Sequence, residues 1–399
     1  MKVTSYETQR PPENERAILV GHVGGSRGER GSGREFIDRS IDELALLADT
    51  AGAVVADKLL QRRGTLHPAT FLGKGKVEEL KQLAEMRDAA LVIFDDDLTP
   101  AQVKNLENLL QRKVIDRSEL ILDIFARRAR SRESRLQVEL AQLEYTLPRL
   151  TGMWKHLERQ AGGIGTRGPG ETQLETDRRM VREKISRLKR ELADVEKERE
   201  TQRARRRREF RAALVGYTNA GKSTLFNALT RAGVFVENRL FATLDSTTHQ
   251  LVSPERDVAL VTDTVGFIRK LPHHLVASFH STLVEAIEAD VLLHVTDASD
   301  PDFVRHITAV DTVLDKILKE PRPPRIMVFN KSDRLTDDQA AELRVTHPGC
   351  LIVSALTPAT LDELRTEIFA RAAAHARHAR APQPATRPED ERETEPWKP

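Results

Sequence analysis

The 399-residue chain lacks cysteine pairs, long apolar runs and a large excess of either charge. Its single cysteine, Cys350, excludes an intramolecular disulfide framework. No apolar run approaches the roughly 20 residues that cross a bilayer, and the segment from Met1 to Glu15 is too polar for a secretory signal. We therefore expect a cytoplasmic protein without a membrane span. With 39% hydrophobic residues, the chain can bury the cores of two or three domains.

The small net charge of +2 conceals an uneven distribution along the chain. Residues 117–211 contain 25 Lys or Arg against 16 Asp or Glu, whereas the remainder contains 38 basic and 45 acidic residues. This asymmetry predicts a basic surface that meets an acidic partner such as RNA. A solvated helix is the alternative, because basic runs such as Arg205–Arg208 are common in exposed linkers.

The pattern most informative about function is a glycine-rich run between an expected strand at 212–215 and a helical pattern at 224–231. The run consists of Gly216, Tyr217, Thr218, Asn219, Ala220, Gly221, Lys222 and Ser223. Its glycines let successive N–H groups turn toward phosphate oxygens, in front of the positive end of the following helix. In this spacing Lys222 reaches the outer phosphates. The Ser223 hydroxyl is a ligand for a Mg²⁺ ion that bridges those phosphates.

A second segment, after the apolar run at 259–262, is expected to respond to the γ-phosphate. It consists of Asp263, Thr264, Val265 and Gly266. Asp263 would hold a Mg²⁺-bound water, and the Gly266 N–H would meet the γ-phosphate. Gly266 is therefore a candidate catalytic residue beside Lys222.

A third segment, between these two, supplies threonine to the site. It consists of Phe241, Ala242, Thr243, Leu244 and Asp245. Thr243 is a candidate Mg²⁺ ligand and catalytic residue, although Thr247 and Thr248 compete for that role on composition alone.

The base is specified by a polar segment that follows the buried strand expected at 326–329. The segment consists of Asn330, Lys331, Ser332 and Asp333. The Asp333 carboxylate can accept hydrogen bonds from N1–H and the exocyclic amine of guanine, whereas adenine would face it with an acceptor. After the apolar run at 351–353, a further segment could place an N–H on the guanine carbonyl; it consists of Ser354, Ala355 and Leu356. These motifs, in this order, predict a GTP and GDP site.

With these motifs, the chain resembles the HflX family, which are ribosome-associated GTPases of the Obg and HflX group. Besides the nucleotide motifs, the resemblance rests on three segments, Phe71–Leu80, Phe94–Gln102 and Gly162–Gln173. It implies an α/β P-loop GTPase domain and assigns the Mg²⁺ ligand to Thr243. It also implies that the partners are the large ribosomal subunit and its rRNA, and that the protein splits or rescues stalled or idle ribosomes.

Hydrophobic periodicity divides the chain into five parts. Apolar runs alternate with helical patterns up to residue 116, which predicts a small α/β domain with a mainly parallel sheet. Leucine-rich spacings of three and four then predict two long antiparallel helices. The expected parts are a disordered N-terminus at 1–14, an α/β domain at 15–116, a basic helical hairpin with a glycine-rich loop at 117–209, a GTPase domain at 210–375 and a disordered tail at 376–399.

Three weaker motifs leave alternatives open. The glycines of Gly73–Lys76 could mark a second nucleotide site, but a turn that opens a helix explains them without a ligand. The acidic run Asp95–Asp97 could bind a metal, although a helix cap before Thr99 and Pro100 is favoured. The loop at 162–170 could be a plain connector, and the family resemblance favours contact with RNA.

The mechanism depends on an absence, because Phe267 stands where Ras-like GTPases carry the glutamine that orients the attacking water. Intrinsic hydrolysis should therefore be slow, on the order of 10⁻⁴ per second or below, and a partner should accelerate it. We expect a monomeric, Mg²⁺-dependent GTPase that binds ribosomes in its GTP state. A large-subunit assembly factor and an RNA-remodelling protein regulated by GTP are the alternatives.

Overall fold

The computed structural model describes residues 15–23, 33–62, 66–152, 169–205, 209–234, 236–237, 239–255, 257–270, 285–318 and 322–380. Three predicted features lie wholly or mainly outside these residues: the disordered start at 1–14, the glycine-rich loop at 162–170 and the disordered tail. Among the described helices, none is both long and apolar enough to cross a membrane.

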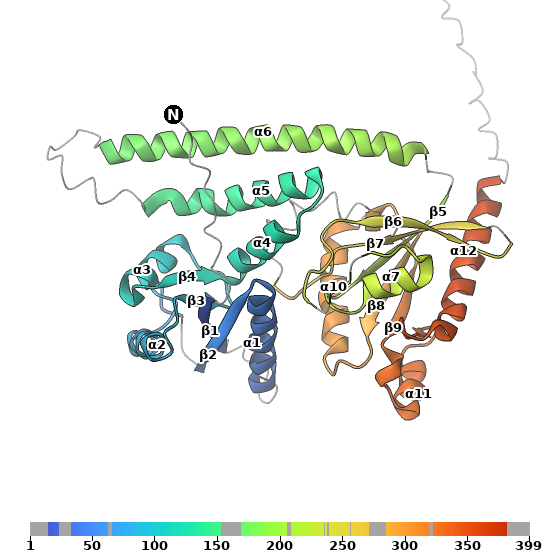
Figure 1. The fold of residues 1–399 in the computed structure, drawn as a ribbon, viewed down its shortest axis with the longest axis horizontal. Coiled ribbons are helices and arrows are strands. Elements are labelled where there is room, and N and C mark those ends of the chain that lie inside the picture. The colour runs from blue at the N-terminus through green and yellow to red at the C-terminus, as the bar shows by residue number, and fades with distance from the viewer. Residues whose placement is uncertain are drawn as a thin grey trace, which may run out of the picture.

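The first part of the chain folds as predicted into an α/β unit with a parallel sheet of four strands, ordered β2-β1-β3-β4 (Figure 1). Its elements are β1 (Glu15–Val23), α1 (Gly33–Thr50), β2 (Ala53–Arg62), α2 (Lys74–Met86), β3 (Leu91–Phe94), α3 (Pro100–Leu110), β4 (Lys113–Asp116) and α4 (Arg117–Arg128). Both faces of the sheet are covered, which is why β3 is apolar and buried throughout. Helix α4 packs against this sheet, so the unit extends beyond the boundary predicted at 116.

Two of the ambiguous motifs have structural roles. Gly73 is the N-cap of α2, so the glycine cluster opens a helix. Thr99 caps α3 in a reciprocal capping box with Gln102, and Pro100 occupies the first turn. The acidic run before it provides no cap, because Asp95 instead pairs with the buried guanidinium of Arg117 at 2.7 Å. The described residues contain no cluster of acidic, histidine or cysteine side chains suited to a metal ion.

The predicted helical hairpin is formed by α5 (Arg132–Thr146) and α6 (Pro169–Arg205), with a 3₁₀ helix, η1 (Leu147–Gly152), after α5. Figure 1 shows the two long helices side by side above the rest of the molecule. Their seam buries Leu140, Val181, Ile185 and Leu188 at helical spacing. Ion pairs flank it, including Lys184 with Glu139.

The remaining residues form a six-stranded sheet ordered β10-β9-β8-β5-β7-β6, in which only the β6–β7 pair is antiparallel. The elements are β5 (Phe210–Gly216), α7 (Lys222–Thr230), β6 (Thr247–Val252), β7 (Val258–Asp263), β8 (Val291–Asp297), α10 (Phe303–Ile317), β9 (Arg325–Asn330), η3 (Ser332–Arg334), α11 (Asp337–Thr346), β10 (Leu351–Ile352), η4 (Pro358–Leu361) and α12 (Asp362–Arg380). Helix α12 continues beyond the end predicted at 375, so residues 376–380 are helical rather than part of the tail.

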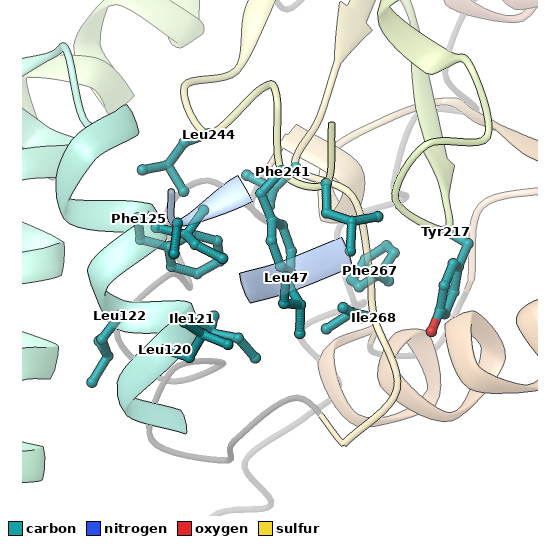
Figure 2. Packing of buried hydrophobic residues seen from close by; sticks show 14 of the residues in the cluster. Leu47, Leu120, Ile121, Leu122, Phe125, Tyr217, Phe241, Leu244, Phe267 and Ile268 are labelled. Atoms are coloured by element: carbon teal, nitrogen blue, oxygen red, sulfur yellow. The ribbon is translucent and has the colours of Figure 1, made fainter. Parts of the chain in front are cut away.

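An apolar core joins the two α/β units. Leu47 of α1 and Phe125 of α4 belong to the same buried cluster as Phe241, Phe267 and Ile268 from the second unit (Figure 2). The Phe125 and Phe241 rings meet edge to face, 4.7 Å between centroids. Such a pair adds roughly 1 kcal/mol beyond the area that it buries. Segments 241–245 and 263–266, which were predicted to contact the nucleotide and its Mg²⁺ ion, therefore belong, with the following Phe267 and Ile268, to the interface between the units.

Candidate nucleotide-binding site

The glycine-rich run forms the turn between β5 and α7. Gly221 has φ +86°, and a Cβ there would lie 2.4 Å from Nδ2 of Asn330, so the position requires glycine. Lys222 is the first residue of α7, and its Nζ donates to the carbonyl oxygens of Gly216 at 3.1 Å and Tyr217 at 2.9 Å. Burial lowers the pKa of Lys222 to about 8, and Asp263 opposes that shift. The ammonium is thus held at the helix N-terminus, where anions bind.

Three hard oxygen atoms converge beside this turn. Oγ of Ser223 lies 2.7 Å from Oγ1 of Thr243 and 2.5 Å from Oδ2 of Asp263. Burial raises the pKa of Asp263, whereas the Ser223 hydroxyl and then Lys222 lower it. Oδ1 of Asp263 is buried and has no hydrogen-bond partner among the described residues. Hydroxyl and carboxylate oxygens are the ligands that Mg²⁺ prefers, so these residues fit that ion. The competing threonines lie in β6, where Thr247 is the register partner of Asp263 and Oγ1 of Thr248 lies 2.9 Å from Oγ1 of Thr262. The Ser223 hydroxyl contacts Thr243 rather than either of them.

Gly266 lies over the phosphate loop. A Cβ on Gly266 would come within 2.7 Å of Cα of Thr218 and 3.0 Å of Nζ of Lys222. Two backbone hydrogen bonds join the following residue, Phe267, to the phosphate loop. Thr218 N–H donates to Phe267 O at 2.7 Å, and Phe267 N–H donates to Gly216 O at 3.1 Å. This places the glycine beside the ammonium that would meet the outer phosphates. The flanking Thr264 and Val265 are buried.

A cavity of about 510 Å³ adjoins the loop at the ends of β8 and β9. Asn330 links the phosphate loop to the segment at 354–356, because its Nδ2 donates to Ala220 O at 2.9 Å and its Oδ1 accepts from Ala355 N–H at 3.1 Å. Oδ1 of Asp333 accepts from Oγ of Ser354 at 2.5 Å. The predicted base-reading residues lining the cavity are Asn330, Lys331, Asp333, Ala355 and Leu356. The sequence motifs at 330–333 and 354–356 therefore meet in one pocket.

Two residues predicted to contact the nucleotide, Tyr217 and Asp245, have side chains that bind other parts of the protein. The Tyr217 ring lies against His306, with 3.9 Å between ring centroids, and its hydroxyl bonds to Glu43 in α1. The Asp245 carboxylate accepts from Ser131 Oγ at 2.5 Å and from the Arg130 and Ser131 N–H groups at 3.1 and 3.2 Å. It therefore holds the turn between α4 and α5. Both residues retain only their backbone for a nucleotide.

Asp297, at the end of β8, belongs to the site although no sequence motif predicted it. Its Oδ2 accepts from Nζ of Lys331 at 2.6 Å, and the same ammonium donates to Asn219 O at 3.0 Å. Asp297 thus fixes a base-pocket lysine against the phosphate loop. A sequence signal was present, because residues 291–295 are apolar except for His294 and predict a further buried strand that ends at this edge.

Comparison with known proteins identifies three family regions that together span most of the chain. A family described as "GTP-binding GTPase N-terminal" matches residues 38–126, "GTP-binding GTPase Middle Region" matches 128–206, and "50S ribosome-binding GTPase" matches 211–331. The GTPase HflX of Flavobacterium psychrophilum is 51% identical over 319 residues, which are 80% of this chain and 76% of that protein. The chain belongs to the HflX family. Its GTPase domain makes it a GTP hydrolase, as predicted.

Other HflX proteins are similar to this chain to about the same degree. The GTPase HflX of Escherichia coli is 48% identical over 299 residues, covering 74% of this chain and 70% of that protein. Among solved structures, the chain is similar to a GTP-binding protein from Sulfolobus solfataricus in complex with GDP. That likeness has 23% identity and a TM-score of 0.44 over 90% of this chain and 99% of the other.

Proposed function

We propose that this HflX-family GTPase binds the large ribosomal subunit and its rRNA in the GTP state, splits or rescues stalled or idle ribosomes, and leaves after hydrolysis. This places the protein in the cytoplasm, with the ribosomes. One observation carries the proposal. Asp245, two residues from the candidate Mg²⁺ ligand Thr243, holds the turn at which the basic hairpin begins. A change at the γ-phosphate would therefore reach the hairpin directly.

The nucleotide chemistry follows from the site. Mg²⁺, held by Ser223 and Thr243 with Asp263 behind them, would neutralise charge on the phosphates. Lys222 and the N–H groups of α7 would bind the phosphate oxygens, and the Gly266 N–H would meet the γ-phosphate. Asp333 would accept from the guanine edge, which favours GTP over ATP.

Phe267 supports a requirement for an activating partner. Its side chain is 2% exposed and lies in the apolar core between the units, so it has neither the chemistry nor the position to orient a water. Supply of the missing group by a partner is worth about three to five orders of magnitude in other GTPases. The ribosome is the partner that we propose.

The hairpin supports contact with rRNA. Arg179, Arg182, Arg187 and Arg190 are exposed along α6. Some of this charge is offset by acidic neighbours, as in the pair of Arg187 with Glu191 at 3.6 Å. Arginine side chains at the surface position a protein on phosphate backbones without reading sequence.

The test is GTP hydrolysis by the purified protein alone, with large subunits, with whole ribosomes and with naked rRNA, while sedimentation follows the particles. We expect at least about tenfold stimulation by large subunits or ribosomes, and dissociation of whole ribosomes with a non-hydrolysable GTP analogue. Stimulation without dissociation would indicate an assembly factor. If no particle stimulates hydrolysis and naked RNA binds equally well in every nucleotide state, the RNA-remodelling alternative replaces this proposal.

A further inference from the structure

A carboxylate from outside the GTPase domain lies between two segments of the nucleotide site. Glu43, in α1, accepts from the Tyr217 hydroxyl at 2.9 Å through each of its oxygens. It also accepts from Nε and Nη2 of Arg269 at 3.0 and 2.9 Å. The Arg269 N–H in turn donates to the Tyr217 hydroxyl at 2.9 Å. The phosphate loop and the segment after Gly266 are thus tied to each other through one acidic side chain of the N-terminal unit.

Glu43 is itself held by a buried charge network. Arg117, whose side chain is 2% exposed, donates to Glu43 at 2.5 Å and to Asp95 at 2.7 Å. Asp95 then accepts from Nζ of Lys270 at 2.6 Å. Arg117 therefore anchors two carboxylates of the N-terminal unit, and each carboxylate binds one of the consecutive residues 269 and 270. A buried ion pair need not add stability, but the loss of one partner leaves an uncompensated buried charge.

The protonation of Tyr217 suits this arrangement. Burial, and after it the Glu43 carboxylate, raises the pKa of the Tyr217 phenol. The phenol therefore keeps its proton at neutral pH and donates a hydrogen bond to Glu43.

The contacts lie on both sides of the residues that would meet the γ-phosphate. Tyr217 precedes Thr218, whose N–H binds the carbonyl of Phe267. Arg269 follows Gly266 by three residues, and the intervening Phe267 and Ile268 are 2% and 1% exposed. Because residue 267 cannot orient a water, the rate depends on how well the backbone around Gly266 is placed.

We propose that Glu43 is a positioning residue for GTP hydrolysis, which holds the phosphate loop and the segment after Gly266 in register from outside the GTPase domain. It touches no reacting atom and acts through Tyr217 and Arg269. The N-terminal unit then contributes to the chemical step as well as to the contacts of the molecule with its partner. This inference concerns hydrolysis by the protein alone and does not require the ribosome.

The experiment compares Glu43→Gln with Asp42→Asn in the full-length protein. Gln keeps the size of the side chain and removes its charge. Asp42 is the neighbouring acidic residue, and it forms an exposed pair with Lys58 at 2.6 Å. Single-turnover hydrolysis of bound GTP gives the rate, and titration with a fluorescent GDP gives the affinity. We expect Glu43→Gln to lower the rate by about tenfold or more while GDP affinity changes less than about threefold, because a misplaced group affects the transition state selectively. Asp42→Asn should leave both quantities within about twofold, as is usual for exposed pairs.

A double-mutant cycle separates positioning from a general loss of structure. Because Glu43 acts on the segment after Gly266 through its contact with Arg269, Arg269→Gln and the double variant should hydrolyse GTP at nearly the same rate as Glu43→Gln. Additive losses would overturn the proposal, as would an unchanged or raised rate in Glu43→Gln or a parallel loss of GDP affinity. If Glu43→Gln does not fold, Tyr217→Phe decides the question, since it removes a single hydroxyl and leaves the ion pairs. A rate within twofold of the unmodified protein in that variant would refute the inference.

Discussion

The replacement of Gly266 by alanine gives a direct test of how closely the switch segment approaches the phosphate loop. The new Cβ would lie 2.7 Å from Cα of Thr218 and 3.0 Å from Nζ of Lys222. Restoring an ordinary carbon contact of about 3.4 Å to the Thr218 backbone requires a shift of about 0.7 Å, which exceeds the tolerance of roughly 0.5 Å for a catalytic group. A misplacement of about 1 Å can cost roughly a hundredfold in rate. We therefore expect Gly266→Ala to slow hydrolysis by about ten- to a hundredfold.

The assay is single-turnover hydrolysis together with GDP affinity. GDP lacks the γ-phosphate, so its affinity should change by less than about threefold if Gly266 acts on that phosphate. Gly75→Ala is the matched control, because a Cβ at that position in α2 would meet no atom within 4 Å beyond its chain neighbours and the backbone of its own helix. A Gly266→Ala variant that hydrolyses GTP as fast as the control would refute both the close approach and the role of the residue.

Three further substitutions test the guanine contact, the Glu119 carboxyl of α4 and the turn between α4 and α5. Asp333→Asn should weaken GTP binding by about a hundredfold or more and admit xanthosine triphosphate, whose 2-oxo group needs a donor; competition binding checks this, and an unchanged base preference contradicts it. Burial raises the pKa of Glu119 from 4.5 to about 7, so folding takes up a proton in that range and stability falls as the pH rises through it. Glu119→Gln should remove this loss of stability, which is about 3 kcal/mol at most. Urea unfolding at pH 5 and at pH 7.5 measures it, and a midpoint that changes equally with pH in the variant and in the unmodified protein would contradict the prediction. Asp245→Ala removes three hydrogen bonds to the α4–α5 turn and should speed hydrogen exchange at the Arg130 and Ser131 amides by about tenfold or more, whereas unaltered exchange would mean that the contact does not hold the turn.

The sequence by itself determined the nucleotide pocket to a large extent. The motifs at 216–223, 263–266 and 330–333 each follow an apolar run, and those runs became β5, β7 and β9 of one sheet. Because the carboxyl ends of parallel strands meet at one edge, strand order along the chain was enough to bring these motifs together. The paired helices α5 and α6 were likewise readable, since leucine spacing specifies a helical face.

Only the tertiary structure decided where the side chains between the units point. Glu43 and Arg269 are separated by 226 residues, and no periodicity or motif links them. Spacing along the chain had placed Tyr217 and Asp245 at the nucleotide, yet both side chains turn to the N-terminal part of the molecule. The reason is physical. Local patterns follow from backbone geometry over a few residues. An interface instead depends on how two complete units dock, and docking is driven by the burial of surfaces that exist only once each unit has folded.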